Sequence, residues 1–249
     1  MAGQPNERKA MVALLEGLLV GAVQPMESVA AWAGRLMPDH ATPLTRRFID
    51  ELEAEWFPAV PPDAFCELIA AQVREHLSAW HPGWPHLWAH VLRVTGTVVA
   101  LAPEAGIDPA PAYLMGICHD VAKLDEFRTG EPHEEVGAAF AGEVLRGHLP
   151  AAQVEAIQAA IRKEGDDPMA HLLHDADKLD KIGAAGLVRR VSTDTDLGWL
   201  PVALSRVADD TRSFPAMHFD LSADLVDRKL TFQAWFLPLA EEAIREPWS

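Results

Sequence analysis

Alanine and leucine recur at three- and four-residue spacing along nearly the whole chain, and prolines fall where such segments begin or end. This spacing places apolar side chains on one face of an α-helix, whereas few stretches alternate as β-strands do. The pattern therefore predicts an all-α fold. The predicted helices are 9–22, 27–37, 43–57, 63–79, 84–102, 109–122, 133–147, 151–164, 168–190 (continuous or interrupted), 200–211 and 222–246.

Breaks in the helical pattern suggest how the chain is organised. Prolines cluster after the third predicted helix, and residues 80–85 are again rich in Pro and Gly. We therefore expect a boundary near residue 75, between an N-terminal helical extension or cap of residues 1–75 and a second domain of residues 76–249. The extension is a cap, a dimerisation surface or added core, and the sequence does not choose among them. Residues 192–220, rich in Asp, Ser and Thr, predict a connector or a lid.

Composition narrows the class of protein. The 249 residues include 37 acidic and 21 basic side chains, a formal charge of −16 that disfavours a nucleic-acid polymer or an anionic membrane as partner. Residues 11–23 are apolar but contain Glu16, so we expect neither a membrane span nor a signal peptide. Cys66 and Cys118 stand alone, which predicts no disulfide framework or cysteine zinc site and favours a cytoplasmic location. A homodimer stays open.

The chemistry of this chain is concentrated in its histidines and aspartates. An apolar run ends abruptly at His119 and Asp120, two potential metal ligands in adjacent positions. His90 lies on an earlier predicted helix, four residues after His86. Asp175 and Asp177 lie in a later one, where flanking apolar residues place them at the edge of a core. Asp175 and Asp177 diverge on a helix, so only one is expected to bind a metal directly.

Three runs together resemble the HD superfamily of metal-dependent phosphohydrolases, whose signature is H…HD…D on a helical core. They are His-Val-Leu-Arg-Val from His90, His-Asp-Val-Ala-Lys from His119, and Asp-Ala-Asp-Lys-Leu-Asp from Asp175. The resemblance covers roughly residues 76–246. It implies an HD-domain-like helical bundle with one divalent ion, Mn, Fe, Co, Ni, Zn or Mg. The implied ligands are His90, His119, Asp120 and Asp177, with Asp175 as the second choice for the last position.

A second metal is not expected. His133 matches one additional ligand of the dinuclear members of the superfamily, but Arg162-Lys163-Glu164 stands where further histidines would lie. The Gly-Tyr-Pro extension of the cyclic-dinucleotide phosphodiesterases is also absent. We therefore predict one ion, with His133 beside the substrate.

A metal-bound water attacking a phosphate ester is the reaction that this resemblance implies. We assign catalytic roles to Asp120, His133, Glu134 and Lys123, and phosphate contacts to Arg93, Lys123 and Lys178, which lie close to the predicted ligands. The predicted substrate is a nucleotide or another small phosphate ester.

Two rival functions use the same scaffold. A dinuclear iron oxygenase is disfavoured by the missing histidine near Lys163, and a noncatalytic sensor would bind a nucleotide without turnover. Cys118 is expected to be buried and not a nucleophile. The remaining histidines are expected to support the site or to be ordinary surface and core residues: His40, His76, His81, His86, His148, His171, His174 and His218.

Overall fold

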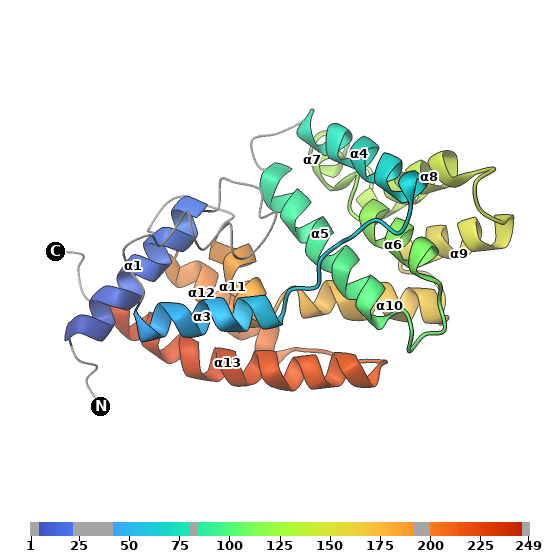
Figure 1. Ribbon diagram of the computed structural model, residues 1–249. Coiled ribbons are helices and arrows are strands. Elements are labelled where there is room, and N and C mark those ends of the chain that lie inside the picture. The colour runs from blue at the N-terminus through green and yellow to red at the C-terminus, as the bar shows by residue number, and fades with distance from the viewer. Residues whose placement is uncertain (1–4, 22–41, 80–83, 192–199, 246–249) are drawn as a thin grey trace. The chain divides into compact units, whose positions relative to one another are not determined.

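The computed structural model describes residues 5–21, 42–79, 84–191 and 200–245 (Figure 1). This part of the chain is all-α, as predicted, and its only β-type pairing is an isolated bridge between Arg146 and Leu149. The helices are Pro5–Gly21 (α1), Pro43–Ala54 (α3), Ala64–Ser78 (α4), Trp84–Leu101 (α5), Pro109–Cys118 (α6), Lys123–Thr129 (α7), His133–Leu145 (α8), Ala151–Ile161 (α9), Pro168–Leu179 (α10), Gly183–Val191 (α11), Leu200–Arg212 (α12) and Asp220–Ile244 (α13).

Most predicted helices are present with boundaries shifted by a few residues. The helix predicted at 168–190 is interrupted by a turn at residues 180–182, and the next helix begins at Gly183, which has a φ of 76°. The short α7 was not predicted, and Gly130 ends it with a φ of 75°. Within the predicted connector 192–220, residues 200–212 are helical, while 192–199 lie outside the described residues. The predicted helix 27–37 also lies outside them.

The chain divides into two compact units, which we describe separately. Unit 1 contains Met1–Trp56, Lys178–Ala216 and Asp224–Ser249, and unit 2 contains Phe57–Asp177 and Met217–Ala223. These units are defined by packing. The division at residue 75 concerns function and not packing, and it stays a prediction.

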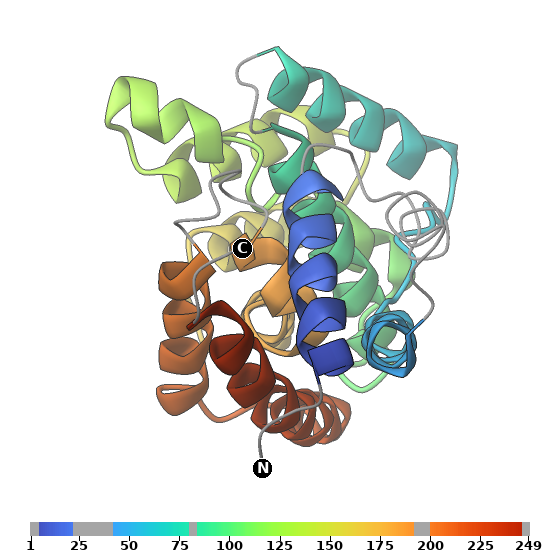
Figure 2. The ribbon, with the colours of Figure 1, turned by 90° about the vertical axis from the view of Figure 1, so that its left-hand side faces the viewer.

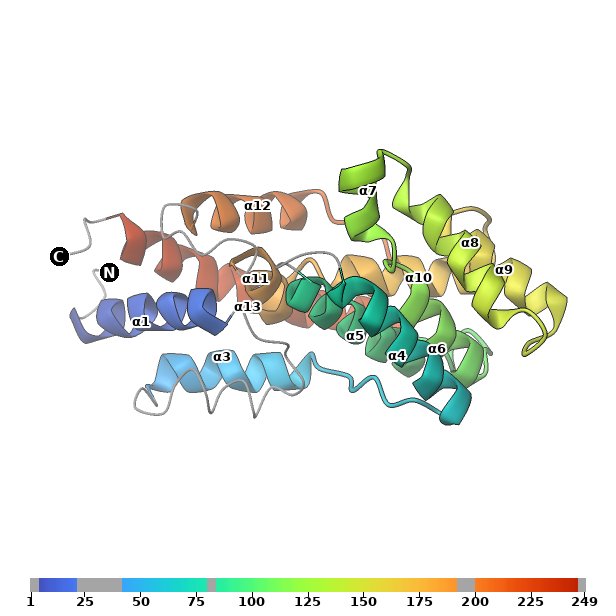
Figure 3. The same ribbon diagram turned by 90° about the horizontal axis from the view of Figure 1, so that it is seen from above.

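Unit 2 is built around α6, whose residues from Pro111 to Cys118 are all buried. Helix α6 packs against α4, α5, α8 and α9, and α4 lies across α5 and α6 (Figure 3). Gly116 allows a close approach of α5 and α6, because a methyl group at this position would lie 2.8 Å from Cα of Thr95. This contact brings the middle of α5 next to the C-terminal end of α6, where His119 and Asp120 follow.

In unit 1, α1 lies next to α3, which Figure 2 shows end-on, and both helices contact α11. Its aromatic core includes Phe48, Phe232 and Phe236, with ring centroids 5.4–5.7 Å apart. The same unit buries an ion pair in which Lys229 Nζ lies 2.8 Å from Oε2 of Glu55. The two oxygens of Glu55 also accept hydrogen bonds, each 3.0 Å long, from the backbone N–H groups of Ala184 and Ala185 at the start of α11. Every member of this polar group therefore has a complementary partner.

Candidate metal centre

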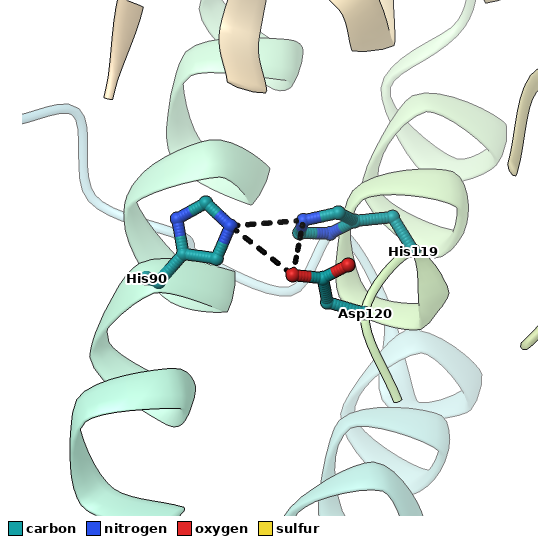
Figure 4. A group of neighbouring side chains, drawn as sticks. All are labelled: His90, His119 and Asp120. Atoms are coloured by element: carbon teal, nitrogen blue, oxygen red, sulfur yellow. Dashed lines mark hydrogen bonds and ion pairs between the residues drawn. The ribbon is translucent and has the colours of Figure 1, made fainter. Parts of the chain in front are cut away.

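His90, His119 and Asp120 meet where α5 passes the end of α6 (Figure 4). Helix α6 ends at Cys118, earlier than predicted, and the chain then turns through residues 119–122. At this turn the adjacent His119 and Asp120 side chains reach the same point. All three residues are buried, and their ligand atoms lie within 4.8 Å of one another.

The facing atoms of His119 and Asp120 are hydrogen-bond acceptors. Nδ1 of His119 lies 2.7 Å from the carbonyl oxygen of Gly116, so this nitrogen carries the proton and Nε2 carries a lone pair. Nε2 of His119 lies 3.3 Å from Nε2 of His90, which in turn lies 3.4 Å from Oδ2 of Asp120. Two tetrahedral zinc ligands at ordinary bond lengths are separated by about 3.3 Å. The spacing and the donor types therefore fit one divalent ion.

The electrostatics of the site keep these groups in the forms that bind metals. Burial lowers the pKa of His119, which favours the neutral imidazole. Burial alone would raise the pKa of Asp120, but the neighbouring His119, His133 and His90 outweigh it and hold that pKa well below its ordinary value. A neutral imidazole beside an ionised carboxylate is the combination that a metal ion requires.

Asp177 and Asp175 lie on α10 but have different surroundings. Oδ1 of Asp177 lies 3.6 Å from Nε2 of His90, close to the three converging ligands. Asp175 is fully buried and accepts hydrogen bonds from the backbone N–H groups of His218 and Phe219. The structure thus brings Asp177 near the cluster and engages Asp175 elsewhere, although the ligand assignment itself stays a prediction.

His133, the first residue of α8, lies beside Asp120 with 3.3 Å between its Nε2 and Oδ1 of Asp120. Its Nδ1 lies 2.7 Å from Oε2 of Glu126 and 3.0 Å from Oε2 of Glu134. Lys123 Nζ lies 2.9 Å from Nε2 of the same ring. The predicted His133, Glu134 and Lys123 are therefore neighbours of the cluster. Glu126 is an addition that the sequence did not reveal, because it depends on the unpredicted α7.

Lys163 is a second functional candidate that the sequence analysis missed. It follows α9 with a φ of 60°, a left-handed conformation that is uncommon for a residue other than glycine. Its ammonium group forms an ion pair with Glu134. Burial opposes its charge, but Glu134, and behind it Asp177 and Asp120, raise the pKa of Lys163. The sequence showed Lys163 where a histidine was sought, and only the structure shows its cation near the predicted ligands.

The other predicted residues lie on the same elements. Arg93 is buried on α5, three residues after His90, and its charge contributes with burial to a lowered pKa of His86. Lys178 follows Asp177 on α10, and its phosphate role stays a prediction. Cys118 is buried, as expected, and desolvation raises its pKa to about 12, which disfavours the thiolate.

Comparison with known proteins now identifies the class of domain. The HD domain family model matches residues 87–182, which contain all of the predicted metal ligands. Residues 87–182 therefore form an HD domain, and HD domains generally belong to metal-dependent hydrolases.

Solved structures show a similar architecture. A predicted HD superfamily hydrolase from an uncultured Thermotogales bacterium is 25% identical, with a TM-score of 0.54 over 71% of this chain and 92% of that chain. Bacillus subtilis YpgQ in complex with ADP is 17% identical, with a TM-score of 0.50 over 73% of this chain and 95% of that chain. None of the curated proteins matches the chain. Among the described helices, none has the length and apolar character needed to cross a membrane.

Proposed function

We propose that this protein hydrolyses a nucleotide or another small phosphate ester, using one divalent metal ion held by His90, His119, Asp120 and Asp177. The observation that carries the proposal is the buried group of acceptor atoms from His90, His119 and Asp120, which lie 3.3–3.8 Å apart. A buried ionised carboxylate beside the lone pair of His119 Nε2 favours a cation at this point. Two imidazoles and two carboxylates suit Mn, Fe, Co, Ni or Zn. Mg is an alternative, although it is a hard ion that prefers oxygen ligands.

When bound, the ion supplies an activated water and neutralises charge on the phosphate. The protein's own groups then control protons. His133 donates Nδ1–H to Glu126, which orients the ring and directs Nε2 toward Asp120 and Lys123. Nε2 is therefore the atom that takes a proton from water or delivers one to the leaving oxygen. Glu126 acts as a positioning residue, because it touches the ring and not the ligand cluster.

Cations beside the cluster provide the phosphate contacts. Lys123 lies against His133, and Lys163 is held by Glu134 within the field of Asp120 and Asp177. We assign both ammonium groups to nonbridging phosphate oxygens, together with the predicted Arg93 and Lys178. Lys163 thus places a positive charge in the segment where the dinuclear members of the superfamily have metal-binding histidines.

The net charge of −16 favours a small substrate over a polymer, because it repels an extended polyanion. For a compact anion, attraction to cations within the site outweighs the screened repulsion from distant surface charges. The ADP complex of YpgQ makes nucleoside diphosphates a natural first class to test. We propose that residues 1–75 act as an extension to this catalytic domain.

The test is a hydrolysis screen of the purified chain against nucleoside mono-, di- and triphosphates, with Mn, Co, Ni, Zn or Mg added in turn. We expect metal-dependent release of phosphate or pyrophosphate, abolished in Asp120→Ala. The matched control is Asp108→Ala, a change of the same type at the residue preceding α6, where Asp108 forms no capping hydrogen bond. Tight nucleotide binding without turnover for any metal would contradict the proposal and favour the sensor. Oxygen uptake with bound iron would favour the oxygenase.

A further inference from the structure

Unit 2 contains another group of metal-ligand side chains, separate from the predicted centre. His174 and Asp175 lie on α10, and His218 lies in the segment that precedes α13. Their ligand atoms lie within 4.8 Å of one another. We infer that these three residues bind a second transition-metal ion of the zinc, cobalt or nickel class, and that this ion ties residues 217–219 to α10.

The distances fit coordination. Oδ1 of Asp175 lies 2.7 Å from Nδ1 of His218 and 3.2 Å from Nδ1 of His174. The 3.2 Å separation is close to the ligand-to-ligand distance of about 3.3 Å expected around tetrahedral zinc, and the 2.7 Å hydrogen bond would lengthen when an ion replaces its proton. Two imidazoles and one carboxylate form a donor set that such ions prefer, with the remaining position open to water.

The two oxygens of Asp175 have different tasks. Oδ2 accepts the backbone N–H groups of His218 and Phe219, at 2.9 and 3.3 Å. This oxygen fixes the carboxylate, which is fully buried, and leaves Oδ1 facing the two imidazoles. The His174 and His218 side chains are each 36% exposed, so an ion can enter from solvent.

His171 fixes the orientation of His218 from outside the group. Their rings stack with centroids 3.9 Å apart and an interplanar angle of 12°. Nε2 of His171 lies 2.6 Å from Oδ1 of Asp166, so a carboxylate holds the supporting ring in turn. Orientation of a ligand imidazole by neighbouring groups is a regular feature of metal sites.

The second group is distinct from the predicted catalytic centre because of helical geometry. Asp175 and Asp177 are two residues apart on α10, a rotation of about 200° around the helix axis. Asp177 lies beside His90, whereas Asp175 lies beside His218. The two sites therefore use opposite flanks of one helix, and the second does not depend on the proposed hydrolase activity.

The experiment measures metal stoichiometry in the full chain, expressed without a polyhistidine tag and stripped with a chelator. Zinc bound after dialysis is measured by mass spectrometry, and Co²⁺ is titrated while visible absorption is followed. We expect about two equivalents in the wild type and about one in His218→Ala. Asp120→Ala should also bind about one, and the double variant almost none. His148→Ala is the matched control, because His148 stacks on Phe65 away from both groups.

An unchanged stoichiometry in His218→Ala would overturn the inference and leave a hydrogen-bonded clamp. If His218→Ala fails to fold, His174→Gln removes a ligand from a half-exposed position and must show the same loss. A different result would support the second site while contradicting the proposed catalytic centre. In that result, the wild type and Asp120→Ala would each bind one equivalent of metal, and His218→Ala would bind none.

Discussion

Two buried polar groups in this protein differ in the partners that surround their carboxylates. In unit 1, the carboxylate of Glu55 receives the ammonium group of Lys229 and two backbone N–H groups. In unit 2, Nε2 of His119 lies beside Nε2 of His90, which lies beside the carboxylate of Asp120. The first group joins a carboxylate to a cation and N–H donors, whereas the second gathers imidazole and carboxylate atoms that can bind a metal ion.

The contrast separates a structural polar group from a functional one. A satisfied buried network stabilises or specifies a fold, and one that is rich in acceptors is costly unless a ligand completes it. Burial and charge alone do not distinguish the two cases. The balance of donors and acceptors does, and it indicates a metal ion only in unit 2.

The largest expected effect comes from replacing each of the two aspartates of α10 by asparagine in turn. Asp177→Asn should lower kcat/KM on the order of 10³-fold, because it removes a ligand from the acceptor-rich group. Asp175→Asn should change kcat/KM by less than about tenfold and lower the free energy of unfolding by about 2 kcal/mol, since it weakens charge-assisted bonds from His218 and Phe219. Steady-state kinetics and urea unfolding measure both. Equal losses of activity would contradict the assignment of Asp177.

Breaking the satisfied group should affect stability and not metal affinity. Glu55→Ala leaves a buried ammonium group on Lys229 and two unpaired N–H groups, so we expect a loss of about 3–5 kcal/mol in the free energy of unfolding. Glu51→Ala removes a surface pair with Arg228 and should cost less than about 1 kcal/mol. Thermal and urea denaturation provide the comparison. A Glu55→Ala protein as stable as Glu51→Ala would show that the pair is not structural.

Lys163 allows function and backbone strain to be separated. Lys163→Asn should change the free energy of unfolding by less than about 1 kcal/mol, because the better tolerance of asparagine for the left-handed conformation offsets the lost ion pair with Glu134. The same change should lower kcat/KM by about 10- to 100-fold, since a charged contact to phosphate is lost. Lys9→Asn, at an exposed position of α1, is the control for the general loss of a charge. Unchanged kinetics in Lys163→Asn would remove Lys163 from the substrate site.

The smallest expected effect is a pH dependence of metal binding. Burial lowers the pKa of His119 below its ordinary value of 6.5, so protons do not compete for Nε2 above that pH. Metal affinity should be insensitive to His119 above pH 6.5 and should decline by up to about tenfold per pH unit well below it. Without metal, the free energy of unfolding should decrease as the pH falls from 6.5 toward the lowered pKa of folded His119. In this interval the unfolded chain binds a proton that folded His119 does not. Calorimetric titrations at several pH values test this, and affinity that rises on acidification would contradict it.

The sequence predicted the elements whose information is local. Three- and four-residue spacing predicted the all-α class, and an apolar run ending in His119-Asp120 predicted the centre of the site. Helix α7 was missed because seven residues carry too little apolar periodicity, although Gly130 is a typical helix-ending signal.

Tertiary packing supplies what the sequence could not. Glu126 reaches His133 only because α7 turns back toward α8, and Lys163 reaches Glu134 from the end of α9. The two aspartates of α10 are equivalent in sequence, and their neighbours His90 and His218 distinguish them. Such contacts join residues that are distant in sequence, so periodicity and spacing do not reveal them.

The most direct test of the central claim is Mn²⁺ binding, followed by electron paramagnetic resonance, in the tag-free chain carrying His218→Ala. We predict about one bound ion, lost when His119→Ala is added and retained when Glu51→Ala is added instead. Absence of bound Mn²⁺, or binding that survives loss of His119, would contradict the assignment of the buried acceptor group as the metal centre.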